Sequence, residues 1–179
     1  LEMACYYACV GSQVTVIEML DHIAGATDRE LGKMLQKELE NKGIRFLLSH
    51  KVTGVQPGMV FAEDASGNQI SVSASKVLLS IGRRANCQGI GLENIGVRFD
   101  RGITTDTQGR TNVPGVYAIG DVNGHHMLAH TAYREAEVAV NTILGKQDTM
   151  RYHANPSVIY TQPEIASVGK TEEECRGKG

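Results

Sequence analysis

The feature that most constrains the fold is the alternation of helical and β-branched segments over the first 48 residues. Residues 1–10 (LEMACYYACV) predict the end of a helix followed by a glycine cap, and residues 13–18 (QVTVIE) predict a buried parallel strand. A capping box at 27–30 is expected to open a second helix, and residues 44–48 predict the next strand. Strands separated by helices pair in parallel, so this order predicts an α/β fold.

The pattern changes after residue 50. Three short strands at 52–55, 59–63 and 69–72 predict an antiparallel meander, and residues 76–81 (KVLLSI) predict another apolar strand. Together these segments predict a Rossmann-like unit in which a meander takes the place of the later helix. Its first strand and glycine-rich turn would lie upstream of Leu1, and we therefore expect apolar side chains to be exposed beside QVTVIE.

The second half of the chain carries fewer regular elements. Residues 116–119 (VYAI) predict a buried strand, and residues 129–144 predict a strongly amphipathic helix. Two further short strands (PSVIY and IASVG) and a helix start at Thr171 follow. From residue 155, short strands followed by a helix are expected, as at the start of an α+β domain.

Composition excludes several classes of function. The chain has 179 residues, a formal net charge of -2 and an isoelectric point near 6.3, which gives no support for a nucleic-acid partner. No apolar run approaches the roughly 20 residues that cross a bilayer, and no signal-peptide pattern is visible. We expect no membrane association.

The cysteines and histidines give no metal signature. The four cysteines include no CxxC pair, and Cys5 and Cys9 are interpreted as buried apolar fillers of a helix. His125, His126 and His130 have no neighbouring carboxylate or thiol and are interpreted as loop residues. Free thiols favour a reducing compartment, so we expect a cytoplasmic protein without a bound metal.

Glu18 is the first candidate binding residue. In dinucleotide-binding βαβ units an acidic residue at the end of the second strand holds the adenosine ribose, about 20 residues beyond the first glycine of the phosphate turn. A carboxylate there repels a 2′-phosphate and therefore favours NAD over NADP. The alternative is a solvated charge at a strand end.

Two further candidates follow the predicted strands. Gly82 and the pair Gly120-Asp121 stand where strands of α/β folds present ligands, although each could be a plain turn. The segment Met127–His130 precedes the 129–144 helix, where free backbone N–H groups and the positive end of the dipole suit an electron-rich ligand.

Five strings resemble consecutive landmarks of the flavoprotein disulfide reductases, the pyridine nucleotide–disulfide oxidoreductases. They are VTVIE, VLLSIGRRAN, TNVPGVYAIGDVNG, MLAHTAYREAE and PSVIYTQPEIASVGKTEEE, and they follow in the same order over nearly the whole chain. The GD pair is shared by many flavoproteins. MLAH before an acidic helix is narrower and resembles the dihydrolipoamide dehydrogenase branch of the family.

The resemblance implies two cofactors, FAD and NAD. It assigns four residues to NAD: Glu2, Glu18, Val52 and Gly82. It assigns five residues to FAD, with the Asp121 carboxylate on the ribityl chain and the others beside the isoalloxazine: Asp121, Met127, Leu128, Ala129 and His130. Ala85 departs from the family, in which proline often follows the IGRR string.

The resemblance also implies an organisation. Residues 1–84 would be an NAD domain without its first strand, 85–153 the returning part of the FAD domain, and 154–179 the start of a dimerisation domain. The parent would be a homodimer that oxidises lipoyl domains of 2-oxo acid dehydrogenase or glycine cleavage complexes. The family's Cys-x4-Cys pair and its His-Glu base are absent, so the chain has no catalytic residues and should be inactive alone.

Two alternatives remain open at this point. One is a sister enzyme, such as a mercuric reductase or a soluble transhydrogenase. The other is a non-catalytic nucleotide-binding module that keeps the scaffold without the chemistry.

Overall fold

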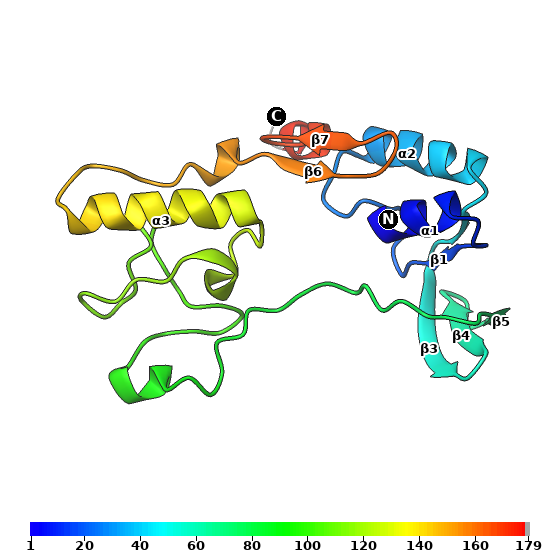
Figure 1. Cartoon of the computed structure of the whole chain (residues 1–179), viewed down its shortest axis with the longest axis horizontal. Helices are drawn as coiled ribbons and strands as arrows, with labels where there is room; N and C mark the ends of the chain where they lie inside the picture. Colours follow the sequence, from blue (N-terminus) through cyan, green and yellow to red (C-terminus); the bar gives the residue numbers. More distant parts are fainter. Residues whose placement is uncertain (178–179) are drawn as a thin grey trace. The chain divides into compact units, whose positions relative to one another are not determined.

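The computed structural model describes residues 1–177, which form two compact units (Figure 1). The first unit combines Leu1–Leu79 with the segment that begins at Pro156, and the second comprises Ser80–Asn155.

A small parallel sheet forms the start of the first unit. Its elements are α1 (Glu2–Cys9), β1 (Thr15–Ile17), α2 (Arg29–Asn41) and β2 (Arg45–Leu47). β1 and β2 pair in parallel, with Val16 opposite Phe46. The predicted parallel α/β arrangement is confirmed, and β1 is half-buried rather than fully buried.

The predicted glycine cap of α1 is confirmed. Gly11 has a φ of 91°, and its N–H donates to the Ala8 carbonyl at 3.0 Å. The N–H of Ser12 donates to the Tyr7 carbonyl at 2.9 Å. This pair of bonds is the Schellman arrangement, which needs a left-handed residue and therefore favours glycine.

The core of the first unit lies between α1 and α2. Leu35 and Leu39 of α2 are fully buried, as their helical spacing predicts, whereas Met34 is 60% exposed. They pack in one cluster with Ala4, Cys5, Ile23 and Ile44. Of the two cysteines of α1, only Cys5 is the buried filler that the sequence predicts; Cys9 is exposed.

The predicted meander is confirmed. Strands β3 (His50–Gln56), β4 (Met59–Asp64) and β5 (Gln69–Ser73) pair antiparallel in that order. The central strand β4 buries Val60 and Ala62. A register shift between Val52 and Gly54 marks a bulge in β3.

The hairpin of β6 (Ser157–Ile159) and β7 (Ile165–Ser167) and the helix α4 (Glu172–Arg176) complete the first unit. Thr171 caps α4 in a capping box with Glu174. The capping box predicted at 27–30 is wrong: Asp28 is the N-cap residue of α2, but its side chain makes no bond to that helix.

Instead, the two helices cap each other. Asp28 Oδ1 accepts the N–H of Glu172 at 2.7 Å, and Glu173 Oε1 accepts the N–H of Arg29 at 3.2 Å. The first backbone N–H of each helix thus finds a carboxylate on the other helix.

Two predicted strands, 76–81 and 116–119, do not form. Residues 76–81 belong to no strand, and their apolar side chains are open to solvent, with Ile81 86% exposed. In the second segment only Tyr117 forms an isolated bridge, to Arg110. A strand exists only where a neighbour receives its N–H and C=O groups, and no strand in the described part of the chain lies beside either run.

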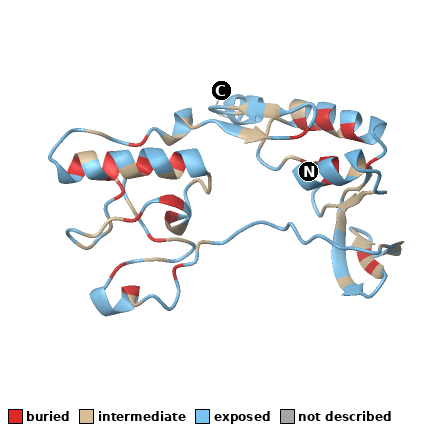
Figure 2. Ribbon diagram, viewed as in Figure 1, coloured by how far each residue is buried: buried red, intermediate tan, exposed pale blue. Residues whose placement is uncertain are grey.

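The second unit is built mainly from turns packed against one long helix. Its elements are η1 (Leu92–Ile95), η2 (Gly120–Asn123), α3 (Ala129–Ile143) and η3 (Tyr152–Ala154). Buried residues recur along one face of α3 (Figure 2): Thr131, Glu135, Val138, Ala139 and Thr142. This face confirms the predicted amphipathic helix.

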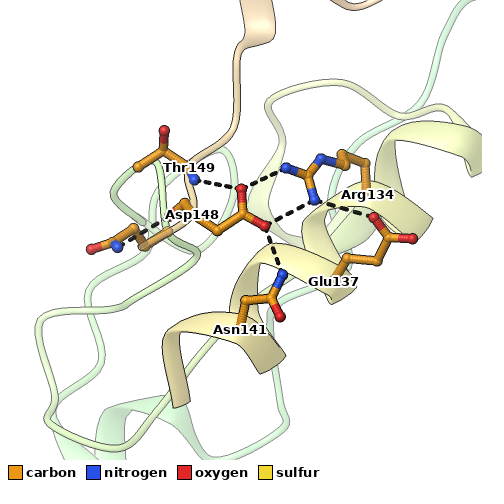
Figure 3. Close-up of polar contacts among 6 residues, drawn as sticks. Arg134, Glu137, Asn141, Asp148 and Thr149 are labelled. Carbon is orange, nitrogen blue, oxygen red and sulfur yellow. Dashed lines mark hydrogen bonds and ion pairs between the residues drawn. The ribbon is translucent and has the colours of Figure 1, made fainter. Parts of the chain in front are cut away.

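A polar cluster fastens the segment after α3 back onto that helix (Figure 3). Arg134 donates to both carboxylate oxygens of Asp148, at 3.0 and 2.5 Å, and Asn141 Nδ2 donates to Asp148 Oδ2 at 2.8 Å. The N–H of Thr149 also donates to Asp148, at 2.9 Å. These bonds hold the pKa of the Asp148 carboxyl down at about 2, with the Arg134 guanidinium as the largest cause.

Candidate functional site

The turn η2 places Asp121 at the surface of the second unit. The Asp121 carboxylate is exposed and accepts no hydrogen bond from the residues that the structure describes. Gly120 has a φ of 73°, and a Cβ there would lie 3.3 Å from Cβ of Ala132 on α3. The turn is therefore close against α3, and the glycine that the sequence singled out is required by both the backbone angle and the space.

The helix α3 begins shortly after this turn in the chain, at Ala129 (Figure 1). Leu128 is the N-cap residue and supplies no side-chain cap, so no side chain of the cap covers the first N–H groups of the helix. Met127 and Leu128 are half-buried, whereas Ala129 and His130 are exposed. The second unit thus contains an exposed carboxylate and a helix N-terminus in neighbouring segments, although the strand that the sequence predicts before Asp121 does not form.

Glu135 is the residue that sequence reasoning missed. It is only 2% exposed, and its Oε2 accepts the N–H of Gly120 at 2.5 Å. Its Oε1 accepts the hydroxyl of Tyr152 at 2.8 Å. In the sequence, REAE is only part of an acidic helix, and no local signal distinguishes this buried carboxylate from its exposed neighbour Glu137.

Asn123, at the end of the same turn, adds a buried donor. Its Oδ1 accepts the N–H of His125 at 3.0 Å, while its Nδ2 is buried and has no partner among the described residues. Buried donors are normally paired, so an unpaired one beside the turn fits a site that receives a hydrogen-bonding ligand.

Glu18 occupies the predicted position at the end of β1. Its Oε1 accepts the N–H of Leu20 at 2.8 Å, and its backbone carbonyl accepts the N–H of His50 at 3.0 Å. The second bond brings Glu18 beside the start of β3, the strand that contains Val52. Val52 is 43% exposed.

The other two residues assigned to NAD, Glu2 and Gly82, belong to other segments of the chain. Glu2 is in the first turn of α1, and its Oε1 accepts the N–H of Tyr160 at 2.8 Å. Gly82 belongs to the second unit, with a φ of 106° and open space around its Cα. The structure thus brings Glu18 close to β3. Among the described residues, the Glu2 carboxylate is bonded to the N–H of Tyr160 and not to Glu18 or β3.

A hollow of about 310 Å³ opens at the start of α2, lined by Asp21, His22, Arg29, Gly32, Lys33 and Gln36. Asp21 Oδ1 accepts hydrogen bonds from His22 at 2.7 Å and from Arg29 at 2.9 Å. The His22 bond and then the Arg29 bond lower the pKa of Asp21. This hollow could not be predicted from the sequence, because its polar residues come from a loop and a helix face.

Residues 1–177 contain neither a metal-binding cluster nor a helix suited to a membrane. No group of three or more His, Cys, Asp or Glu side chains in this range could hold a metal ion. No helix in the same range is both long and apolar enough to cross a membrane.

A parallel βαβ segment, an antiparallel meander and a glycine–aspartate turn before a helix define a protein of the Rossmann-like FAD/NAD(P)-binding class. The family model of the pyridine nucleotide-disulphide oxidoreductases matches residues 1–136, and the chain belongs to this family.

Relatives of known name agree with this assignment. A dihydrolipoyl dehydrogenase 3 of Pseudomonas putida is 43% identical over all of this chain, and a mitochondrial dihydrolipoyl dehydrogenase 2 of Arabidopsis thaliana is 41% identical. A leghemoglobin reductase of Glycine max is 39% identical. The chain spans about 40% of the length of these relatives.

Solved structures show the same fold. LpdA of Mycobacterium tuberculosis matches with a TM-score of 0.87 and 27% identity, covering 99% of this chain and 39% of that one. The HOCl-induced flavoprotein disulfide reductase RclA of Escherichia coli matches with a TM-score of 0.84 at 23% identity, covering 99% of this chain and 41% of that one, which supports the fold alone.

Proposed function

We propose that this chain is the nucleotide-binding part of a dihydrolipoyl dehydrogenase, which oxidises protein-bound dihydrolipoyl groups with FAD and NAD⁺. The observation that carries the proposal is the alignment of the whole chain with dihydrolipoyl dehydrogenases at about 40% identity. In such an enzyme the flavin relays electrons from a dithiol to NAD⁺, and the protein supplies binding and orientation.

The second unit would hold FAD. The Asp121 carboxylate would accept hydrogen bonds from ribityl hydroxyls, because it is exposed and charged and has no protein partner within the described residues. The segment Met127, Leu128, Ala129 and His130 would lie beside the isoalloxazine, and the first N–H groups of α3 would face its electron-rich edge. The unpaired Nδ2 of Asn123 supports this assignment.

The first unit would hold NAD. Glu18 is fixed at the end of β1 and would accept the ribose hydroxyls, with Val52 of the neighbouring strand beside the adenine. Glu2 is the third proposed NAD residue of this unit, whereas Gly82, which lies in the second unit, is proposed as an NAD residue on the family resemblance alone. Glu2 would keep acceptor capacity for the ribose, since each carboxylate oxygen has two lone pairs and the N–H of Tyr160 uses one of them.

The proposed organisation of the parent follows from the same assignment. Residues 1–84 would belong to an NAD domain, 85–153 to an FAD domain and 154–179 to a dimerisation domain. The parent would be a homodimer that acts on lipoyl domains of 2-oxo acid dehydrogenase or glycine cleavage complexes. Four free cysteines support a reducing location, for which we propose the cytoplasm, although some of its relatives are named as mitochondrial.

Asp121→Ala in an intact enzyme carrying this segment tests the flavin assignment. A hydrogen bond to a charged group contributes on the order of 1.5–3 kcal/mol, so its loss should weaken FAD binding roughly ten- to hundred-fold. Flavin release on dilution, measured by fluorescence, gives the change. Asp100→Ala removes another exposed carboxylate of the same unit and serves as the control. Equal FAD retention in both variants would contradict the assignment.

A reductase with another substrate is the second candidate, because leghemoglobin reductases match the chain at 39–40% identity, nearly as well as dihydrolipoyl dehydrogenases. Comparing NAD-linked turnover of dihydrolipoamide and of ferric leghemoglobin by one preparation separates the two. An intact protein that binds FAD and NAD but turns over neither substrate would be a nucleotide-binding module.

A further inference from the structure

Glu135 is a buried carboxylate whose two oxygens serve two different segments. Oε2 accepts the Gly120 N–H at 2.5 Å and Oε1 accepts the Tyr152 hydroxyl at 2.8 Å, while the residue is 2% exposed. An unpaired buried carboxylate is strongly unfavourable, so these two donors account for its presence in the core.

The Gly120 contact fixes the start of the turn that carries Asp121. Other contacts fix the rest of this turn: the N–H of Ile103 donates to the Val122 carbonyl at 2.9 Å. A Cβ at Gly102 would lie 2.5 Å from the Asn123 carbonyl oxygen, which shows how closely the chain packs there. The exposed Asp121 side chain is therefore carried by a backbone that contacts on both sides of it hold in place.

The Tyr152 contact connects the same carboxylate to a ring cluster. The Tyr152 ring is parallel to that of His126, with interplanar angle 6° and centroids 5.5 Å apart, and lies 4.9 Å from that of His125. Burial of the Tyr152 phenol, followed by its bond to Glu135, raises its pKa. The phenol therefore stays protonated and remains a donor to Glu135.

We propose that Glu135 is a positioning residue of the flavin site, which holds the Gly120–Asp121 backbone in the orientation that presents the Asp121 carboxylate. This inference rests on the proposed binding of FAD by Asp121. Glu135 itself would not touch the flavin, since it is only 2% exposed and its oxygens accept bonds within the protein.

Three variants of the intact holoenzyme test this role through the FAD dissociation constant and the visible flavin spectrum. Glu135→Ala removes both acceptors and should weaken FAD binding about tenfold or more. Glu135→Gln keeps the shape, an oxygen for Gly120 and an amide that can donate to the Tyr152 oxygen, so it should restore affinity to within about threefold of the parent. Tyr152→Phe keeps the Gly120 bond and should have an intermediate effect.

The decisive measurement combines Glu135→Ala with Asp121→Ala. If Glu135 acts through Asp121, the double variant binds FAD no more weakly than Asp121→Ala alone. Additive losses would assign Glu135 a purely structural role and overturn the proposal, as would unchanged affinity in Glu135→Ala. Thr142→Val is the control, because Thr142 is also buried on α3 but its hydroxyl has no partner within the described residues.

Hydrogen exchange at the Gly120 amide separates this proposal from the one on which it rests. Faster exchange in Glu135→Ala together with unchanged FAD affinity in Asp121→Ala would mean that the turn is held as described but that Asp121 does not bind flavin. Loss of affinity in Asp121→Ala with no change in Gly120 exchange would instead overturn the role of Glu135 alone. Should Glu135→Ala fail to fold, Glu135→Gln and Tyr152→Phe still give the predicted order of affinities, and the reverse order overturns the proposal.

Discussion

Glu18 is fixed through both its backbone and its side chain. Its N–H donates to the Leu47 carbonyl at 3.0 Å, its carbonyl accepts from His50, and its Oε1 accepts from Leu20. The carboxylate therefore has little freedom to swing away from a ligand at the end of β1. A fixed negative charge discriminates by repulsion as well as by attraction, because it repels the charge of a 2′-phosphate brought near it.

Replacing Glu18 with Arg should reverse this discrimination. We expect the ratio of kcat/KM for NAD to that for NADP to fall by about tenfold or more in an intact enzyme carrying this segment, since repulsion of the 2′-phosphate becomes attraction. Steady-state kinetics with both cofactors give the ratio. Glu38→Arg makes the same charge change at an exposed position in the C-terminal half of α2 and should leave the ratio unaltered. An unchanged ratio in Glu18→Arg would remove Glu18 from the proposed site.

The candidate residues differ in how far a sequence can identify them. Asp121 follows an apolar run and a glycine, so its place at a turn could be predicted from its neighbours. Glu135 could not, because its two partners lie 15 and 17 residues away and on opposite sides in the sequence. A buried carboxylate and an exposed one look alike in an amphipathic helix until the segments packed against it are known.

At the scale of elements, the caps of α2 and α4 show the same limit. The string Thr27 to Glu30 predicts a capping box within α2, yet the carboxylate that receives the Arg29 N–H comes from Glu173, 144 residues away. In contrast, the box at Thr171 and Glu174 is local and forms as its spacing predicts. Local signals predict a helix start, but the donor–acceptor pairing at that start also depends on tertiary contacts.

Asp28→Ala tests the mutual capping of these helices. Loss of the bond to the Glu172 N–H should cost about 0.5–2 kcal/mol of unfolding free energy, the usual range for a cap. It should also speed hydrogen exchange at that amide, measured by NMR. Glu30→Ala, which removes an exposed acid from the same helix turn, is the control. Equal exchange rates in the two variants would show that Asp28 does not cap α4.

The two strands that failed to form have a different cause. Residues 76–81 and 116–119 have the apolar, β-branched composition of strands. A strand also needs a neighbouring backbone that pairs with its N–H and C=O groups, and composition does not supply one. By contrast, the meander β3–β4–β5 contains all of its partners within 24 residues, from His50 to Ser73, and could be predicted fully.

Asp148 makes the second unit sensitive to acid. Its folded pKa of about 2 lies below the ordinary value of 3.8, so its bonds to Arg134 and Asn141 stabilise the fold fully above about pH 4. That contribution is lost as the pH falls from about 4 toward 2. We therefore expect Asp148→Asn to be less stable than the parent at pH 7 and to lose less additional stability on acidification. Urea unfolding at pH 7, 4 and 3 measures both effects, with Asp100→Asn as the exposed control; parallel pH profiles for the parent and Asp148→Asn would contradict this role.

At the scale of the whole molecule, the two units rely on different kinds of core. The first unit buries the apolar faces of α1 and α2 in one cluster, whereas the second collects apolar residues from turns and the short helix η1: Cys87, Leu92, Val97, Ile103 and Ala118. The fold class could be predicted because periodic patterns cover the first unit. The second unit consists mainly of turns, and turns lack the hydrophobic periodicity from which helices and strands are predicted. Its fold could therefore be predicted mainly through the resemblance to a family.

The cysteines provide a whole-molecule prediction for the 179-residue chain itself. Cys9 and Cys175 are exposed, whereas Cys5 and Cys87 are buried in the cores of the two units. A thiol reagent should therefore modify two of the four thiols rapidly and the other two only on unfolding, because reaction requires access to the thiolate. The variant Cys9→Ser with Cys175→Ser should lose the rapid phase and keep the slow one.

The same burial pattern predicts that the chain alone does not oxidise dihydrolipoamide, even with FAD and NAD⁺ added. Disulfide exchange needs an accessible thiolate and a second thiol to resolve the mixed disulfide. The two exposed thiols, Cys9 and Cys175, lie on different helices, α1 and α4, and the other cysteine of α1, Cys5, is buried. The rate of NADH formation, followed by its near-ultraviolet absorbance, should equal the rate in a control without protein. Turnover that disappears in the variant Cys9→Ser with Cys175→Ser would show that these thiols can carry the chemistry, and would contradict the prediction.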